Sequence, residues 1–162
     1  MIRRPKDRFS REKPQLKLFY LMLDLVAGVC APTQAGINSQ LRLWTNDTVL
    51  AAMISFAVGT AVLLFYVLLL RIPWPELKIV WTSPWWIWTG GFLGAFLVVA
   101  SIILVPKLGA ATMLGIMIAG QMGAGIVLDH FGLVGYELHP ANLWRCLGAL
   151  LVVCGVIIVK RF

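Results

Sequence analysis

Charged residues divide this chain into long stretches that carry no charge. The longest uncharged runs cover positions 25–41, 48–70, 79–106, 108–128 and 146–159. A helix needs about 20 apolar residues to cross the hydrocarbon layer of a membrane, and these runs reach or approach that length. The pattern therefore predicts an all-α integral membrane protein with five transmembrane helices.

Boundary signals turn these runs into expected helices. Pro84 suits a first helical turn, Pro106 is expected to end a helix at the preceding residue, and the segment 45–48, "TNDT", is typical of a helix start. Arg145 can reach the membrane interface with its flexible side chain, which lengthens the last run. The expected helices are about 18–41, 49–70, 84–105, 108–128 and 143–159, preceded by a basic and disordered tail at 1–17.

Composition supports the membrane interpretation and narrows the function. Of the 162 residues, 60% are hydrophobic and only 13% are charged, which is more apolar surface than a soluble domain of this length can bury. The three cysteines lack metal-ligand spacing, and the sequence contains neither a nucleophile–base pair nor a glycine-rich phosphate loop. We therefore expect no enzyme activity, no cofactor and no metal.

The net charge of +7 is concentrated at the N-terminus, because residues 1–17 hold seven of the fourteen Lys and Arg residues. Acidic lipid headgroups explain such a tail better than nucleic acid does. If the N-terminus is cytoplasmic, that side receives the tail's seven basic residues plus Arg71, Lys78 and Arg145, ten in all. The other side receives four: Arg42, Lys107, Lys160 and Arg161. The positive-inside rule favours this orientation, although without the tail the count is three against four and the helices show no bias.

The first expected helix carries polar residues on one face. Gln34 and Asn38 are four residues apart, one above the other on a helix, and Asp24 lies about 40° away around the axis. A polar stripe is unfavourable against lipid and is expected to face inward, where Pro32 also frees a backbone carbonyl. Gln121 is the other strongly polar side chain deep inside an uncharged run.

These polar residues allow two interpretations. Gln34, Asn38 and Gln121 can pair across helices in a dry network, or they can line a hydrated pocket and bind a small-molecule substrate. Trp88 is the deepest of five tryptophans near the second connection and is a candidate wall of such a pocket. The tryptophan cluster is also typical of an interfacial aromatic belt.

Titratable residues raise the possibility of proton coupling. Asp24 lies about 10 Å along the helix from Lys17, and removal from water there favours the neutral, protonated carboxyl group. Asp24 is thus a candidate proton carrier, and the alternative is a carboxylate that reaches headgroups or the basic tail. Asp129 and His130 either anchor a turn or form a proton relay. An acid in an otherwise acid-free core favours a cationic or zwitterionic substrate over an anion.

Small residues form ridges on the third, fourth and fifth expected helices. Gly90 and Gly94 are four apart, and Gly115, Ala119 and Gly123 continue along one face. Small residues allow transmembrane helices to approach closely, so these positions are predicted helix-packing contacts.

Three motifs carry a family resemblance. "APTQAGINSQL" in the first helix, "PKLGAA" before the fourth and "AGQMGAGIVLDHFGLVG" through its end resemble the small bacterial inner-membrane exporters of the YdcZ type. This family is a five-helix branch of the drug/metabolite transporter superfamily, related to the EamA-type carriers, and the similarity covers about residues 18–160. Gln34, Asn38 and Gln121 lie within the matched motifs, whereas Asp24 lies outside them.

The resemblance implies half of a ten-helix inverted-repeat carrier in the bacterial inner membrane. The other half is either an antiparallel copy of the same chain or an oppositely oriented sister subunit, and the basic tail, which departs from the family pattern, favours the sister. We expect a secondary, proton-coupled transporter subunit that exports a small molecule by alternating access. Gln34 and Asn38 are expected to bind the substrate with help from Gln121. The alternatives are a non-transporting scaffold or accessory subunit, and a passive channel.

Overall fold

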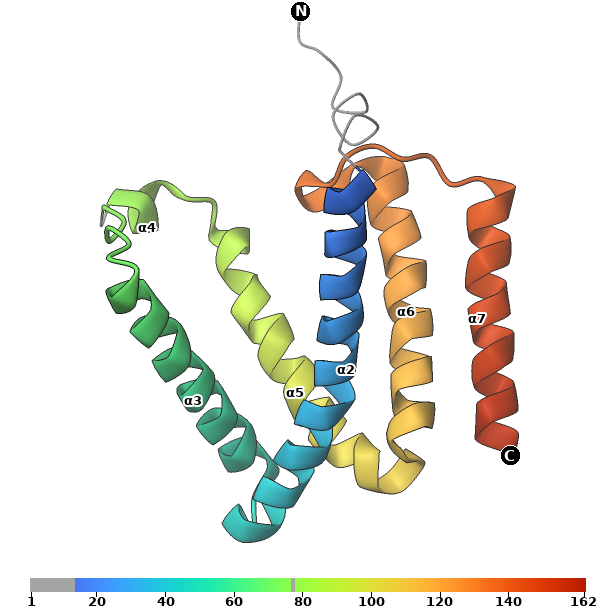
Figure 1. Cartoon of the computed structure of the whole chain (residues 1–162), viewed down its shortest axis with the longest axis horizontal. Coiled ribbons are helices and arrows are strands. Elements are labelled where there is room, and N and C mark those ends of the chain that lie inside the picture. The colour runs from blue at the N-terminus through green and yellow to red at the C-terminus, as the bar shows by residue number, and fades with distance from the viewer. Residues whose placement is uncertain (1–13, 77) are drawn as a thin grey trace, which may run out of the picture. The chain divides into compact units, whose positions relative to one another are not determined.

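The computed structural model describes residues 14–76 and 78–162, and all secondary structure in this part of the chain is helical (Figure 1). Five of its helical segments are long and apolar enough to cross a membrane. The expected all-α fold with five membrane helices is confirmed. Of the expected basic tail, residues 1–13 lie outside the described residues. The long helices are α2 (Pro14–Thr45), α3 (Thr48–Leu69), α5 (Thr89–Leu108), α6 (Ala110–Phe131) and α7 (Leu143–Arg161).

Short helical segments fill two of the connections. The connection from α3 to α5 contains α4 (Lys78–Thr82) and the 3-10 helix η1 (Trp85–Trp88), which continues directly into α5. A second 3-10 helix, η2 (Leu133–Gly135), follows α6. The first α-helical residue after Pro84 is thus Thr89, because the tryptophan-rich segment forms a tighter 3-10 turn.

Contacts divide the chain into two compact units, residues 1–34 and residues 35–162. In the first unit, the described residues form the N-terminal part of α2. Pro32 lies inside this helix and cannot donate a backbone hydrogen bond. The next residue, Thr33, donates its hydroxyl to the carbonyl of Val29 at 2.9 Å.

Local signals account for several helix ends in the second unit. The Asp47 side chain accepts a hydrogen bond from the Leu50 N–H at 2.7 Å, and the Asn142 side chain accepts one from the Arg145 N–H at 2.9 Å. Each satisfies a backbone donor that a helix start leaves free. Gly132 ends α6 in the left-handed conformation, where a glycine avoids steric strain.

The reversal between α5 and α6 takes a single residue. α5 continues through Pro106 to Leu108, beyond the expected end at 105, and α6 begins at Ala110. A proline in the last turn removes one hydrogen bond without exposing a long stretch of backbone. Gly109 has φ 78° and ψ 155°, a conformation open to glycine and strained for other residues.

The buried residues of the second unit gather where α2 ends, α3 begins and the α5–α6 turn lies. We call this region the packed end, and its buried residues are Ala35, Asn38, Ala51, Ala52, Ser101, Ile102 and Met113. Leu41, Val98 and Val99 pack against its core. The opposite region, which we call the open end, comprises η1, the first turns of α5, the last turns of α6 and η2. In Figure 1, α5 and α6 meet at their turn and separate toward the open end.

Candidate functional site

Asn38 is the buried polar residue that its surroundings do not satisfy. Its side chain is 3% exposed, and its amide nitrogen Nδ2 has no hydrogen-bond partner among the described residues. Leu41, nearly one turn later on α2, packs against Ala51, Ala52 and Ile102. A buried amide donor without a partner costs about 1–3 kcal/mol. This amide is therefore a free donor at the packed end, suited to an acceptor group supplied from outside the chain.

Ser101 is the other buried polar residue at the packed end, and it provides a contrast. Its hydroxyl donates to the carbonyl of Val98 within α5 at 2.8 Å. This bond satisfies the donor locally, as is common for serine in membrane helices. The unpaired donor at Asn38 is thus specific to that residue and not a general property of the packed end.

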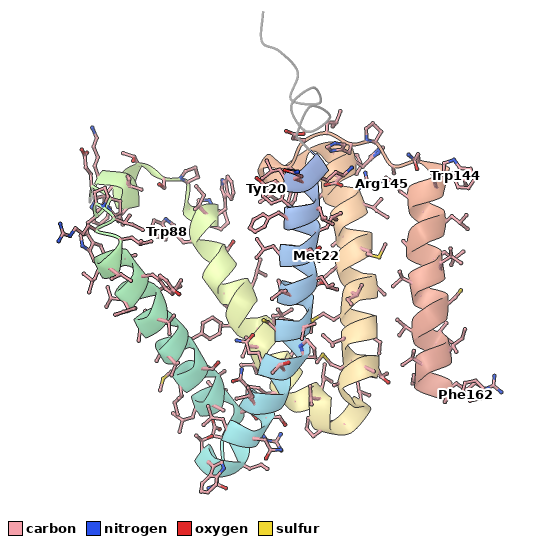
Figure 2. All side chains as sticks on the ribbon, in the orientation of Figure 1. Tyr20, Met22, Trp88, Trp144, Arg145 and Phe162 are labelled. Atoms are coloured by element: carbon pink, nitrogen blue, oxygen red, sulfur yellow. The ribbon has the colours of Figure 1, made fainter. Side chains whose placement is uncertain are left out.

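Gln121 and Trp88 lie in the same unit as Asn38 but away from it. Gln121 is exposed on α6, eight residues beyond the buried Met113, or about 12 Å along the helix axis. Trp88 is 55% exposed and is the residue directly before α5 at the open end (Figure 2). Within residues 35–162, the structure does not bring Asn38 and Trp88 into one site.

Asp24 and Gln34 lie in the first unit, within α2. Both side chains are exposed. The predicted polar set is therefore divided between the two units, with Asn38, Gln121 and Trp88 in the second.

The predicted helix-packing residues differ in what surrounds them. A Cβ atom added at Gly115 would lie 2.7 Å from Cγ2 of Val156, so α6 and α7 are in close contact there. At Gly94 the nearest atom would be the Phe56 ring of α3 at 3.8 Å. Gly90 and Gly123 have no such neighbour within 4 Å, and Ala119 is half-buried. Packing at Gly90 and Gly123 remains a prediction.

A hydrogen-bonded charged cluster joins α6 to α7. The Arg145 guanidinium pairs with the Asp129 carboxylate and donates to the His139 carbonyl at 2.8 Å (Figure 2 labels Arg145). The His139 N–H donates to the Asp129 carbonyl at 2.8 Å, and the Ala141 N–H donates to Nδ1 of His130 at 3.0 Å. These hydrogen bonds of Asp129 and His130 hold the turn in place. They match the anchoring role, the first of the two roles that the sequence suggested.

A cavity of about 600 Å³ lies at the open end, and the polar residues of the sequence did not point to it. It forms where η2, far along the chain, comes close to η1 and the start of α5. Trp86 lines it, whereas Trp88 does not. Its full lining is Trp86, Ile87, Thr89, Gly90, Leu93, Leu133 and Val134. In the sequence, the apolar residues Leu133 and Val134 after α6 were the available sign of this cavity. That they lie opposite η1 and the start of α5 could be seen only in the structure.

Comparison with known proteins agrees with the membrane fold. The profile of the family described as "Putative inner membrane exporter, YdcZ" matches residues 19–158. The curated "Inner membrane protein YdcZ" of Escherichia coli (strain K12) is 33% identical over 118 residues, which is 72% of this chain and 78% of that protein. No solved structure was found to match. With its five membrane-length helices, this multi-pass inner membrane protein therefore belongs to the YdcZ family.

Proposed function

We propose that this chain is a subunit of a secondary transporter that exports a small molecule by alternating access. The family description supports export. The observation that carries the proposal is the Asn38 amide, which is buried at the packed end and has no acceptor among the described residues. A merely structural amide is normally paired, whereas a substrate-binding amide is left free until its ligand arrives.

The two ends of the second unit support an alternating mechanism. Such a mechanism needs one end closed while the other is accessible. The packed end is closed around Ile102, and the open end contains the cavity beside Trp86. With the N-terminus in the cytoplasm, as the basic residues favour, the open end faces the cytoplasm and Asn38 lies toward the outer side. Substrate then enters from inside and meets Asn38 as the outer side opens.

Three further polar residues of the membrane helices have roles in this proposal. Gln34, one helical turn from Asn38 in sequence, and Gln121 on α6 supply further donors and acceptors at other points along the path of the substrate. Asp24 carries the coupled proton, because a carboxyl group in a membrane helix can alternate between a proton and a cationic ligand.

A second five-helix subunit completes the carrier in this proposal. Gln121 is exposed on α6. A Cβ atom added at Gly123, two residues later, would have no neighbouring heavy atom within 4 Å. An exposed amide is unfavourable against lipid, and small residues favour close helix contacts. These features support pairing with an inverted copy of the chain or with an oppositely oriented sister subunit.

Proteoliposomes that enclose a pH-sensitive dye test the proposal. Organic cations such as ethidium, and zwitterionic compounds, are added one at a time, and we expect at least one to drive proton flux. Asn38→Ala and Asp24→Asn are expected to abolish this flux in folded protein. Ser101→Ala is the matched control, because Ser101 is also buried but its hydroxyl is hydrogen-bonded within its own helix.

The results separate the parts of the proposal. Full flux in Asn38→Ala removes the substrate role of this residue, and full flux in Asp24→Asn removes its role in coupling. Proton flux into the proteoliposomes without any added compound indicates a passive channel. Absence of flux with every compound, both for this chain alone and for this chain reconstituted with an oppositely oriented sister subunit, indicates a scaffold or accessory subunit.

A further inference from the structure

The cavity at the open end has the size of a small-molecule site. Its volume of about 600 Å³ falls within the range of about 300–1,000 Å³ that is typical of ligand pockets. Its walls come from two separate parts of the chain, the η1–α5 junction and η2.

The lining is apolar and carries no charge. Thr89 is its one hydroxyl residue, and that hydroxyl already donates to the carbonyl of Trp86 at 2.7 Å. No side chain in the lining is charged, and the indole N–H of Trp86 is the other polar side-chain group beside this hydroxyl. The surface therefore matches an apolar or aromatic ligand, and Trp86 supplies an aromatic ring.

Gly90 helps to create this space. A Cβ atom added at this position would have no neighbouring heavy atom within 4 Å, whereas one added at Gly115 would clash with Val156. Gly90 thus leaves volume free where a larger side chain would occupy it, and Leu93 lines the cavity almost one helical turn later.

The opposite wall is conformationally strained. Val134 has φ 57°, a left-handed conformation that is a genuine outlier for a β-branched residue, and it lies between Gly132 at φ 61° and Gly135 at φ 86°. Such strain persists where the surrounding structure requires it, and it gathers at ligand sites and switch segments. Here it places Leu133 and Val134 on the cavity.

The cavity lies at the ends of membrane helices, beside tryptophans that are typical of the membrane interface. Amphipathic molecules collect at this depth, with apolar parts in the lipid and polar parts in water. We propose that the cavity binds the apolar body of an amphipathic small molecule and is the place where the transported substrate enters from the membrane. The identification of this ligand as the substrate rests on the proposed export function, whereas binding itself does not.

N-phenyl-1-naphthylamine, a neutral aromatic probe, tests the binding site. Purified protein in lipid nanodiscs is titrated with the probe, energy transfer from tryptophan is recorded, and the signal of empty nanodiscs is subtracted. We expect saturable binding that Gly90→Leu weakens at least tenfold. Gly91→Leu is the matched control, since Gly91 is equally open and next in sequence but does not line the cavity.

The binding results test the cavity proposal separately from the proposed transport function. Equal binding by wild type and Gly90→Leu, or equal loss in both glycine variants, overturns the cavity proposal. A phospholipid that native mass spectrometry finds on wild type and not on Gly90→Leu, without saturable probe binding, identifies a structural lipid site and also overturns it. Asn38→Ala is expected to keep full probe binding even though it loses flux.

A second variant covers the case in which Gly90→Leu does not fold by size-exclusion chromatography. Leu93→Trp fills the cavity from the next turn and is expected to weaken probe binding to a similar extent. Unchanged binding in folded Leu93→Trp contradicts the proposal.

Discussion

The packed end and the open end of residues 35–162 are both formed by membrane-length apolar helices, yet they pack very differently. At the packed end, the small residues Ala51 and Ala52 let α3 approach α5, and Ile102 is completely buried. At the open end, Phe92 and Phe96 are 75% and 67% exposed. Lipid solvates a phenylalanine as well as protein does, so apolar character alone does not bring helices together. Small residues and close van der Waals contact do.

Truncation of a large side chain at each end is expected to show the largest difference in stability between the packed end and the open end. Ile102→Ala removes a fully buried side chain and is expected to lower the free energy of unfolding by about 2–4 kcal/mol, because a cavity remains in a close-packed core. Phe96→Ala, on the exposed face of the same helix, is expected to change it by less than about 0.5 kcal/mol. Unfolding titrations in detergent micelles measure both. Equal losses contradict the distinction between the two ends.

Enlarging a small residue examines the same principle on α6. Gly115→Leu places atoms where Val156 lies and is expected to destabilise the protein by about 1–3 kcal/mol, because α6 and α7 must move apart. Gly123→Leu lies on the same helix with open space around it and is the control. Thermal unfolding compares the two. A larger loss in Gly123→Leu indicates that this face packs against another subunit.

The α6–α7 connection is held by polar contacts, although it lies at the same membrane side as the open end. Arg145→Gln loses the ion pair with Asp129 and the bond to the His139 carbonyl, and we expect a loss of about 1–2 kcal/mol, since Arg145 is only partly buried. Arg161→Gln, at the exposed far end of α7, is the control. Hydrogen exchange of residues 132–142 is expected to rise in the first variant alone. Unchanged exchange shows that the loop is ordered without Arg145.

Relief of backbone strain is the smallest expected effect. Val134→Asn replaces a β-branched residue by one that tolerates the left-handed conformation, and its exposed side chain loses little packing. We expect a gain of about 0.5–1 kcal/mol in the free energy of unfolding. Leu133→Asn, where φ is not positive, is expected to give no gain. A loss in Val134→Asn argues against strain at this position.

The sequence was informative wherever a property is local. Uncharged runs revealed five membrane helices, and the helix start expected from "TNDT" is formed by a short-range hydrogen bond to Asp47. The α5 boundary was less predictable, because Pro106 is tolerated in a last turn when Gly109 can reverse the chain directly afterwards. Among the candidate site residues, the amide character of Asn38 was visible, but its burial was not. The cavity at Trp86 escaped notice because its opposite wall lies more than forty residues away in sequence.

By itself, the sequence determined that this protein is a five-helix membrane protein and pointed to its family. Each membrane helix satisfies its own backbone hydrogen bonds and meets lipid directly, so its existence depends on one segment alone. Only the tertiary structure decided that Gly115 contacts α7 while Gly90 faces a cavity, and that Asn38 is enclosed without an acceptor while Ser101 is satisfied. These outcomes depend on which surfaces of distant helices meet, and residues of the same type are equivalent until that contact is made.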